Sequence, residues 1–268
     1  SRPSAPKRTM KPKRLPRLRL LAAGLFVLAE CAAGSARGAF PDVVAEVKRS
    51  VVAVGVVSPL RNPRFRFLGT GFVVGNGNQV VTNAHVLAAV PQNDENEKLV
   101  IALSGLGRVL ARPVTKEAAD PDHDLALLRF EGPPMPALSL GDSATARDGQ
   151  DVAWTGFPLG GAMGITSVTH RGIISAITPV GQPLVNSARE LDTQTLRRLS
   201  AGTYSVLQLD IVSYPGNSGS PLYDVNTGEV LGIVNMVFVR GSKESAITNP
   251  SGISFAIPSS FLKALLKP

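Results

Sequence analysis

From Val43 onward, the sequence is a series of short apolar runs rich in Val and Ile, and Gly, Pro or Asn separates each run from the next. Val and Ile favour strands, and turn residues such as the Gly-Asn-Gly-Asn of residues 75–78 end a strand after a few positions. Many short strands of this kind are typical of an all-β barrel or sandwich. The runs that we expect to form strands are Val51–Val57, Gly69–Val74, Gln79–Thr82, Leu99–Leu103, Ala126–Phe130, Asp151–Gly156, Ile165–Ile177, Val206–Leu209, Val230–Val239 and Ile253–Ile257.

Helical signals are few. We expect a helical turn after His85, a helix near Glu190–Leu199 and a short C-terminal helix over Ser259–Leu266. Ser259 or Ser260 is the expected N-cap of the last helix, because a serine hydroxyl can accept a hydrogen bond from a free backbone N–H of the first turn.

The length of 268 residues suits one folded unit with two lobes. The Pro-rich stretch Glu131–Gly141 is the expected connection between them. It divides the body, residues 40–268, into a first lobe over about 43–135 and a second over about 145–258.

The positive charge of the chain is concentrated at its start. The formal net charge is +8, but residues 1–36 hold eight Lys or Arg and a single acidic residue, Glu30. The rest of the chain holds 20 basic and 19 acidic residues, a net charge of +1. The body therefore has no basic stripe of the kind that binds nucleic acid, and we expect no nucleic-acid partner.

Residues 1–39 have the features of a secretory leader. A basic segment precedes an apolar run, and small residues follow it between Ala33 and Ala39, where we expect cleavage. This pattern predicts export to the periplasm or secretion. An uncleaved membrane anchor is less favoured, because Glu30 interrupts the apolar run. The same Glu30 weakens a lipoprotein reading of Cys31, the one cysteine, so the mature protein is expected to fold without disulfides.

Three local motifs carry side chains suited to nucleophilic catalysis. They are Val81–Val86, which contains His85; Asp120–Leu128, which contains Asp122 and Asp124; and Pro215–Pro221, which contains Ser218. Each motif alone also fits an ordinary turn or strand end. Together, in the order His, Asp, Ser on a β-rich exported chain, they indicate a serine hydrolase.

The chemistry explains the combination. A serine hydroxyl needs a base to take its proton, and histidine suits this role because it titrates near neutrality. A carboxylate then fixes the imidazole tautomer. The expected nucleophile is Ser218, the base His85 and the acid Asp124, with Asp122 as the rival carboxylate. The expected oxyanion donors are the backbone N–H groups of Gly216 and Ser218.

The chain resembles the protease domain of the HtrA (Deg) serine proteases over roughly residues 43–262. The matching motifs occur in the same order: Gly69–Val74, Val81–Val86, Asp124–Leu128, Gly156–Gly160, Gly216–Leu222 and Gly252–Pro258. The resemblance implies two six-stranded antiparallel β-barrels of the chymotrypsin/trypsin-like fold, with the active site in the cleft between them. It also implies His85, Asp124 and Ser218 as the triad, protein or peptide substrates, and a homotrimer. Asp124 is preferred over Asp122 because Leu-Ala-Leu-Leu follows it directly, as in the family.

This sequence departs from the family in three places. HtrA proteases usually carry PDZ domains after the protease domain, whereas this chain stops at Pro268, so we expect no PDZ domain. The nucleophile motif reads Gly-Asn-Ser-Gly-Ser, a variant that also resembles the glutamyl endopeptidases. The segment Thr178–Ser205 is longer than the corresponding loop, which in the family switches the active site on and off.

The resemblance also places a substrate pocket. Its floor is the residue six positions before the nucleophile, here Val212, and its wall is the strand that holds Val234 and Met236. These apolar residues predict cleavage after aliphatic residues. We therefore expect an exported serine endopeptidase that hydrolyses unfolded or extended protein segments. The alternatives are a non-catalytic peptide-binding or chaperone-like module on the same fold, and a membrane-anchored regulatory protease.

No metal or cofactor is expected. The remaining histidines, His123 and His170, are not in a metal-ligand spacing, and the single cysteine lies in the leader. We expect both histidines to be ordinary surface or turn residues.

Overall fold

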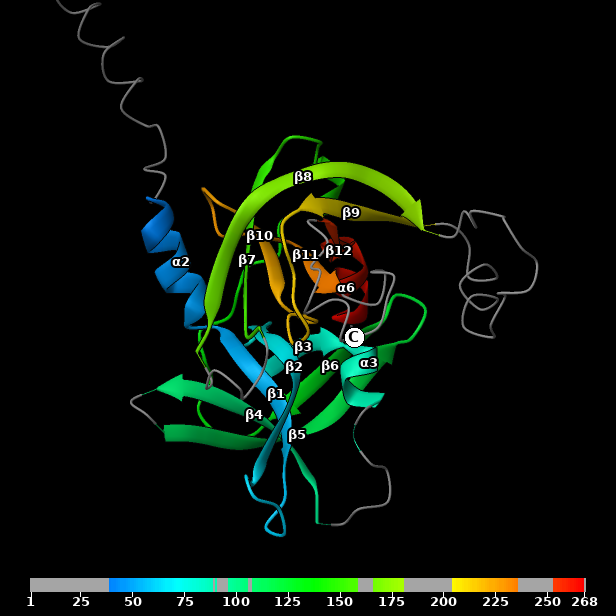
Figure 1. Cartoon of the computed structure of the whole chain (residues 1–268). Coiled ribbons are helices and arrows are strands. Elements are labelled where there is room, and N and C mark those ends of the chain that lie inside the picture. Colours follow the sequence, from blue (N-terminus) through cyan, green and yellow to red (C-terminus); the bar gives the residue numbers. More distant parts are fainter. Residues whose placement is uncertain are drawn as a thin grey trace, which may run out of the picture. The chain divides into compact units, whose positions relative to one another are not determined.

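Twelve strands close into two antiparallel barrels of six strands each. The structure is a computed structural model, and it describes residues 39–88, 90, 96–105, 108–158, 166–180, 204–235 and 253–267. Figure 1 shows the two barrels, the first in blue to green and the second in green to orange. The first barrel consists of β1 (Val51–Val57), β2 (Phe65–Val74), β3 (Gln79–Asn83), β4 (Lys98–Gly105), β5 (Arg108–Asp120) and β6 (Leu125–Phe130). The second consists of β7 (Asp151–Gly156), β8 (Val168–Val180), β9 (Tyr204–Asp210), β10 (Pro221–Asp224), β11 (Val230–Asn235) and β12 (Ile253–Pro258).

This architecture confirms the predicted fold class of two six-stranded antiparallel barrels. The strand order is β1-β2-β3-β6-β5-β4 in the first barrel and β10-β11-β12-β9-β8-β7 in the second. Both orders place each strand beside neighbours that run in the opposite direction, so every ladder is antiparallel. Closure removes the free sheet edges that an open sandwich would leave.

Two strands lie outside the runs expected from the sequence. β5 contains Pro113 together with Arg112, Lys116 and Glu117, so its apolar content is too low to stand out as a run. It nevertheless pairs with β4 on one side and β6 on the other. β10 is only four residues long and follows the nucleophile motif directly. Pairing with neighbouring strands of the barrel determines both strands, and their local sequence does not predict them.

The helices are short and lie at the ends of strands. α3 (Ala84–Ala88) follows β3 and is the helical turn expected after His85. α6 (Ser259–Leu265) is the expected C-terminal helix, but its N-cap is Pro258 and no side chain caps it. The predicted serine N-cap is wrong because the Ser259 hydroxyl donates instead to the carbonyl of Gly141, at 2.9 Å. The expected helix over 190–199 lies outside the described residues.

One further helix, α2 (Phe40–Lys48), was not expected. Pro41 stands in its first turn, where a missing N–H costs nothing, and its buried residues Val43 and Val47 face the core. Among the described residues, no helix is both long and apolar enough to cross a bilayer.

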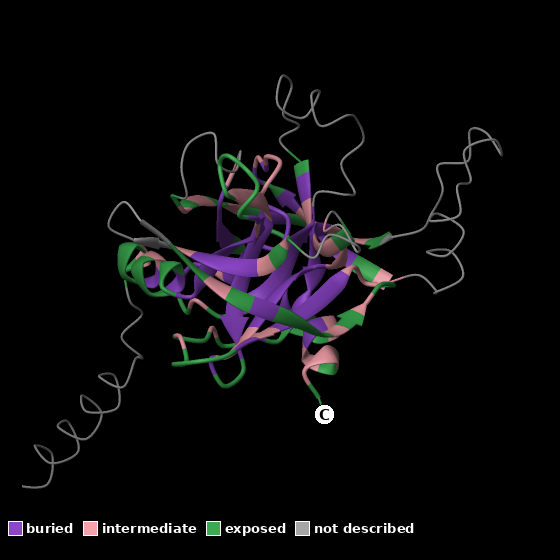
Figure 2. Cartoon of the chain, turned by 90° about the horizontal axis from the view of Figure 1, so that it is seen from below, coloured by how far each residue is buried: buried purple, intermediate pink, exposed green. Residues whose placement is uncertain are grey.

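The core has three clusters, and the largest joins the barrels. One cluster fills the first barrel and another the second. The third contains Phe72 and Leu125 from the first barrel, and Tyr223 and Ile257 from the second. Figure 2 shows the buried residues concentrated along the strands, with exposed residues in the turns and on the outer faces. Because shared apolar contacts hold the barrels against each other, side chains from both can meet in a fixed geometry.

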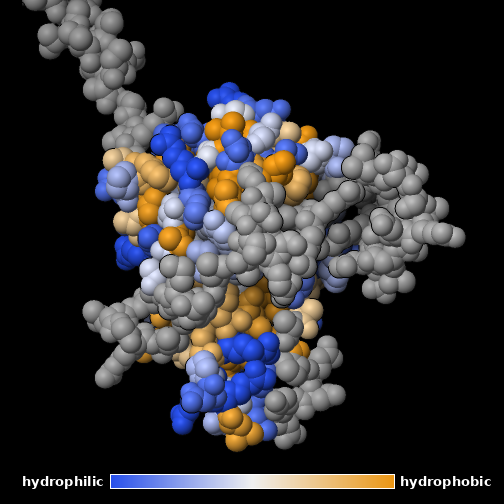
Figure 3. Space-filling view, viewed as in Figure 1, coloured by the Kyte–Doolittle hydropathy of each residue, from blue (hydrophilic) through white to orange (hydrophobic). Residues whose placement is uncertain are grey.

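Some apolar side chains also reach the surface. Val168, Ile173 and Ile177 on β8 are among the large hydrophobic residues that remain exposed. Figure 3 shows hydrophobic side chains over the second barrel, interleaved with hydrophilic ones. This mixed pattern is ordinary for a protein surface.

Candidate active site

The register of the first barrel brings His85 and Asp124 together. β3 and β6 run antiparallel with Asn83 opposite Leu125, so the end of one strand lies beside the start of the other. His85 follows β3 and Asp124 precedes β6. The backbone N–H of Ala84 donates to the carbonyl of Asp124 at 3.0 Å. The side-chain amide of Asn83 donates to the same carbonyl at 3.1 Å.

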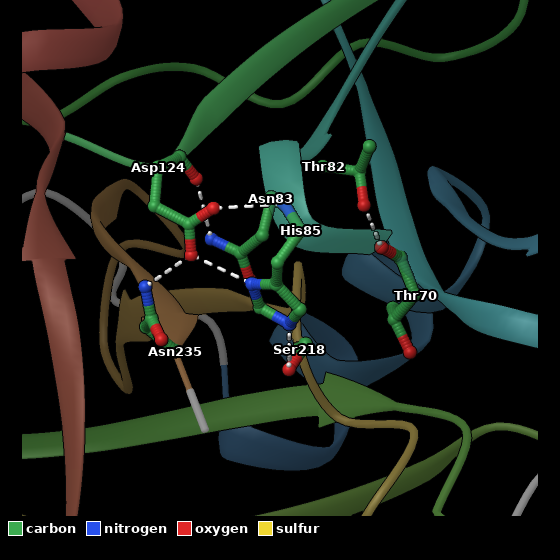
Figure 4. A network of polar contacts seen from close by, with 7 residues as sticks. All are labelled: Thr70, Thr82, Asn83, His85, Asp124, Ser218 and Asn235. Carbon is green, nitrogen blue, oxygen red and sulfur yellow. Dashed lines mark hydrogen bonds and ion pairs between the residues drawn. The ribbon is translucent and has the colours of Figure 1, made fainter. Parts of the chain in front are cut away.

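The carboxylate of Asp124 is held from three directions (Figure 4). Its Oδ1 accepts the backbone N–H of His85 at 2.8 Å. Its Oδ2 lies 2.6 Å from His85 Nδ1 and accepts from Asn235 Nδ2 at 2.8 Å. Asp124 also has a φ of 53°, the only positive φ among the described non-glycine residues. Such a conformation is uncommon, and it is tolerated best by Asp and Asn.

The third side chain, Ser218, comes from the turn between β9 and β10. Its Oγ lies 2.9 Å from His85 Nε2. An ionised carboxylate only accepts hydrogen bonds, so the proton of a neutral His85 ring is on Nδ1, facing Asp124. Nε2 then presents its lone pair to the Ser218 hydroxyl, which can donate to it. The arrangement can therefore move a proton from Ser218 to His85.

The backbone before Ser218 turns sharply. The N–H of Asn217 donates to the carbonyl of Tyr214 at 3.0 Å, with Pro215 and Gly216 between them. Gly216 has a φ of 106°. Pro at the second position of a turn and a positive-φ Gly at the third are the marks of a type II turn. The N–H groups of Gly216 and Ser218 donate to no residue that the structure describes.

Asn235 is a site residue that the sequence analysis did not single out. It lies on the strand expected to form the pocket wall, beside Val234. Val234 is fully buried in the core cluster of the second barrel. Neighbouring side chains on a strand point to opposite faces, so Asn235 faces away from that core and reaches Asp124. This alternation was the available signal. The expected floor residue, Val212, is partly buried just after β9, and Met236 lies outside the described residues.

The rival carboxylate and the other two histidines lie apart from this cluster. Asp122 is exposed. His123 pairs with Asp120, with Nδ1 and Oδ2 2.6 Å apart, and its ring stacks on Phe261 with centroids 3.8 Å apart. His170 lies in β8 and stacks on Trp154, its cross-strand neighbour, at 4.5 Å.

The expectation that both histidines are ordinary surface or turn residues is therefore wrong in part. His123 does lie in a turn, but both rings are partly buried against aromatic side chains, because a flat imidazole packs well on another ring. Within the described ranges, no group of three or more His, Cys, Asp or Glu could hold a metal ion.

Comparisons with known proteins show the family of this chain. The family model of the trypsin-like peptidase domain matches residues 69–233, more than half of the chain. A probable periplasmic DegP-like serine endoprotease of Pseudomonas putida (strain W619) is 34% identical over 191 residues, covering 71% of this chain and 32% of that protein. A DegP-like protein of Halomonas elongata is 34% identical over 194 residues, covering 72% of this chain and 33% of the other. The chain thus spans about a third of the length of these curated relatives.

Solved structures show the same fold. The HtrA-type protease AlgW with a tripeptide has a TM-score of 0.59 and 24% identity, and the match covers 85% of this chain and 62% of that one. The crystal structure of Deg5 has a TM-score of 0.58 and 24% identity, covering 83% and 90%. The relatives confirm the predicted resemblance to HtrA (Deg) proteases. The matched range, residues 69–233, contains His85, Asp124 and Ser218. Because the family model matches more than half of the chain, the chain belongs to the trypsin-like peptidase family.

Proposed function

We propose that the protein is an exported serine endopeptidase that uses His85, Asp124 and Ser218 as its catalytic triad. The observation that carries the proposal is the geometry at the two nitrogens of one ring. His85 Nδ1 is 2.6 Å from the Asp124 carboxylate, and Nε2 is 2.9 Å from the Ser218 hydroxyl. A nucleophile in contact with a base, and a base in contact with its orienting acid, are the requirements for acyl transfer.

The reaction follows from these contacts. Ser218 Oγ attacks the carbonyl carbon of the peptide bond while its proton passes to His85 Nε2. The carbonyl oxygen becomes an oxyanion, which accepts hydrogen bonds from the N–H groups of Gly216 and Ser218. When the C–N bond breaks, His85 gives its proton to the leaving amine and the acyl group stays on Ser218. Water then attacks the ester, with His85 again as the base, and releases the carboxylate product. No cofactor takes part.

The substrate pocket has an apolar floor and wall in this proposal. Val212 offers no carboxylate to pair with Lys or Arg. Val234 and Met236 offer no histidine to hold an acidic side chain. We therefore expect cleavage after aliphatic residues such as Val, Ala, Ile or Leu. Discrimination among them is shallow, because a methylene in such a pocket contributes only about 1–3 kcal/mol.

The relatives support the place and kind of action. Those described above are named periplasmic endoproteases, and one of the similar structures holds a tripeptide. Together with the basic and apolar leader, this supports export to the periplasm and action on extended peptide segments. The homotrimer implied by the resemblance stays a prediction, which sedimentation analysis of the purified protein can test.

The test combines a serine-reactive fluorophosphonate probe with an unfolded casein-like substrate. We expect the probe to label the wild-type protein and not Ser218→Ala, and mass spectrometry of the casein products to show aliphatic residues at the cleaved position. Well-folded wild-type protein that neither labels nor cleaves would favour a non-catalytic peptide-binding module. Products cut mainly after Lys, Arg or Glu would overturn the pocket assignment.

A further inference from the structure

We propose that Thr70 is a positioning residue that holds the oxyanion turn, residues 215–218, in its working conformation. Thr70 lies on β2 in the first barrel, whereas the turn belongs to the second. This inference rests on the proposed function, because it concerns the amides that would stabilise the oxyanion.

Thr70 is fully buried and contacts the turn twice. Its backbone N–H donates to the carbonyl of Ser218 at 2.9 Å. Its hydroxyl donates to the carbonyl of Gly216 at 2.8 Å and accepts the N–H of Phe157 at 3.0 Å. The roles at the hydroxyl are unambiguous, since a carbonyl can only accept and a backbone N–H can only donate. The single hydroxyl proton is therefore committed to Gly216.

Thr70 also contacts the strand that precedes the base. Its carbonyl accepts the hydroxyl of Thr82 at 2.7 Å, and Thr82 lies on β3, three positions before His85. Figure 4 shows Thr70 and Thr82 joined in this way beside the His85–Ser218 contact. One buried residue thus ties the oxyanion turn to the strand that positions the base.

The turn needs an external hold at Gly216. With its φ of 106°, Gly216 adopts a conformation that is open to glycine and costly for other residues, and glycine is also the residue with the greatest backbone freedom. Asn217, the fully buried amide side chain of the turn, makes no hydrogen bond through Nδ2 or Oδ1 to any described residue. Thr70 fixes the carbonyl of Gly216, and with it the peptide plane between Gly216 and Asn217. Because this plane is joined to the one that carries the Gly216 N–H only through the φ and ψ of Gly216, the contact restricts the rotation of the N–H that would face the oxyanion.

The two barrels meet closely here. A Cβ at Gly219 would collide with the carbonyl oxygen of Thr70, and Gly219 also has a φ of 89°. The nucleophile turn therefore lies directly against the backbone of β2. A side chain at position 70 can act on the turn without any intervening group.

The experiment compares Thr70→Val with Thr70→Ser. Valine keeps the shape and removes the hydroxyl, whereas serine keeps the hydroxyl. We expect Thr70→Val to lower kcat about 10- to 100-fold, below the loss seen when an oxyanion donor is removed outright, with KM within about threefold of wild type. A peptide aldehyde with an aliphatic residue adds to Ser218 and places its oxygen in the same hole. Its inhibition constant should rise by a similar factor, and Thr70→Ser should restore both values.

Thr155→Val is the matched control. Thr155 is also fully buried, and its hydroxyl contacts Thr169 and Tyr223 at 2.8 and 2.9 Å within the second barrel. It should lose stability without loss of kcat at a temperature where it stays folded. A kcat for Thr70→Val within about twofold of wild type, or a Thr70→Ser variant as impaired as the valine variant, overturns the inference.

If Thr70→Val does not fold, the pair Thr70→Ala and Thr70→Ser makes the same comparison, because these variants differ by one oxygen. An alanine variant as active as the serine variant overturns the inference. Wild-type protein that neither reacts with the fluorophosphonate nor cleaves casein overturns the proposed function and this inference together. An active wild type with an equally active Thr70→Val overturns the inference alone.

Discussion

Two His–Asp pairs in this molecule have nearly the same geometry. In the first, His85 Nδ1 lies 2.6 Å from Asp124 Oδ2, and the backbone N–H of His85 donates to Oδ1 at 2.8 Å. In the second, His123 Nδ1 lies 2.6 Å from Asp120 Oδ2, and the backbone N–H of His123 donates to Oδ1 at 3.1 Å. Both pairs are partly buried. The His–Asp contact alone therefore does not distinguish the proposed catalytic pair from the other one.

The difference lies in what surrounds the rest of the ring. The Nε2 of His85 faces the hydroxyl of Ser218. The ring of His123 packs between Phe261 and Tyr204, with centroids 3.8 and 4.7 Å away. The first pair joins residues 39 positions apart, whereas the second closes a turn of three. The two pairs therefore differ in the group that faces the second ring nitrogen, and in the proposed function this group, Ser218 from the other barrel, makes the first pair catalytic.

The largest expected effect separates the two histidines. Ser218→Ala and His85→Ala should each lower kcat/KM by about 10⁴-fold or more, because residues that act as one unit lose nearly everything with any member. His123→Phe keeps a ring against Phe261 and removes the ion pair, so its activity should stay within a few fold of wild type. Steady-state hydrolysis of an aliphatic peptide substrate measures all three. Equal losses at both histidines would contradict the comparison.

The carboxylates should follow the same division. Asp124→Asn keeps the size of the side chain but no longer requires the proton of His85 on Nδ1, and we expect a loss of about 10³- to 10⁴-fold in kcat. Asp120→Asn and Asp122→Asn should remain close to wild type, because neither carboxylate reaches His85. The same kinetic assay, with circular dichroism to confirm folding, makes the test. A severe loss at Asp122 with a mild one at Asp124 would reverse the assignment.

A smaller effect is expected at Asn235, a side-chain donor to the first pair that has no counterpart at the second pair among the described residues. Asn235 is fully buried, and its amide donates to Asp124 Oδ2 at 2.8 Å. Asn235→Leu removes this donor at similar volume. A hydrogen bond to a charged group is worth about 1.5–3 kcal/mol, so kcat should fall about 10- to 100-fold. KM should change little, since the contact orients the acid without touching substrate. A variant with altered KM and unchanged kcat would place Asn235 in the pocket instead.

Strands with a continuous apolar run, and the three site motifs, could be predicted from short stretches of sequence. The valine-rich run Val51–Val57 and the run Asp151–Gly156 are observed as strands with the expected bounds. β5 was not predicted because its charged residues and Pro113 interrupt the apolar pattern that is typical of a strand. His85, Asp124 and Ser218 each lie in a motif that is one continuous stretch of sequence, so these residues could be predicted without a structure.

The contacts that support these motifs could not be found in this way. Asn235 reaches Asp124 across 111 positions, and Thr70 reaches Gly216 across 146. Thr70 lies between two glycines in β2, and Asn235 ends an otherwise apolar strand. Alternation along β11 indicates the face on which Asn235 lies, but not the residue that it contacts. Their partners are determined by how the barrels pack, which the one-dimensional pattern does not record. The aromatic stacks of His123 and His170 have the same origin.

The smallest expected effect concerns His170, the histidine without a carboxylate. Its side chain makes no ion pair or hydrogen bond with the residues that the structure describes, and its ring lies flat on Trp154. Burial lowers the pKa of His170 from its ordinary value of 6.5. The unfolded chain then binds a proton at a pH where the folded protein does not. The free energy of unfolding should therefore fall as the pH drops below about 6.5 toward the lower pKa of the folded state.

His170→Phe tests this effect, because it keeps a flat ring on Trp154 and removes the titration. Urea unfolding at several pH values between about 7.5 and 5 should show wild type losing more stability than the variant. The difference should stay below about 1 kcal/mol, because the ring is partly exposed and solvent screens its charge. All other titrating groups are shared, so the difference isolates His170. Parallel pH profiles for the two proteins would show that the ring of His170 is solvated like an ordinary surface histidine.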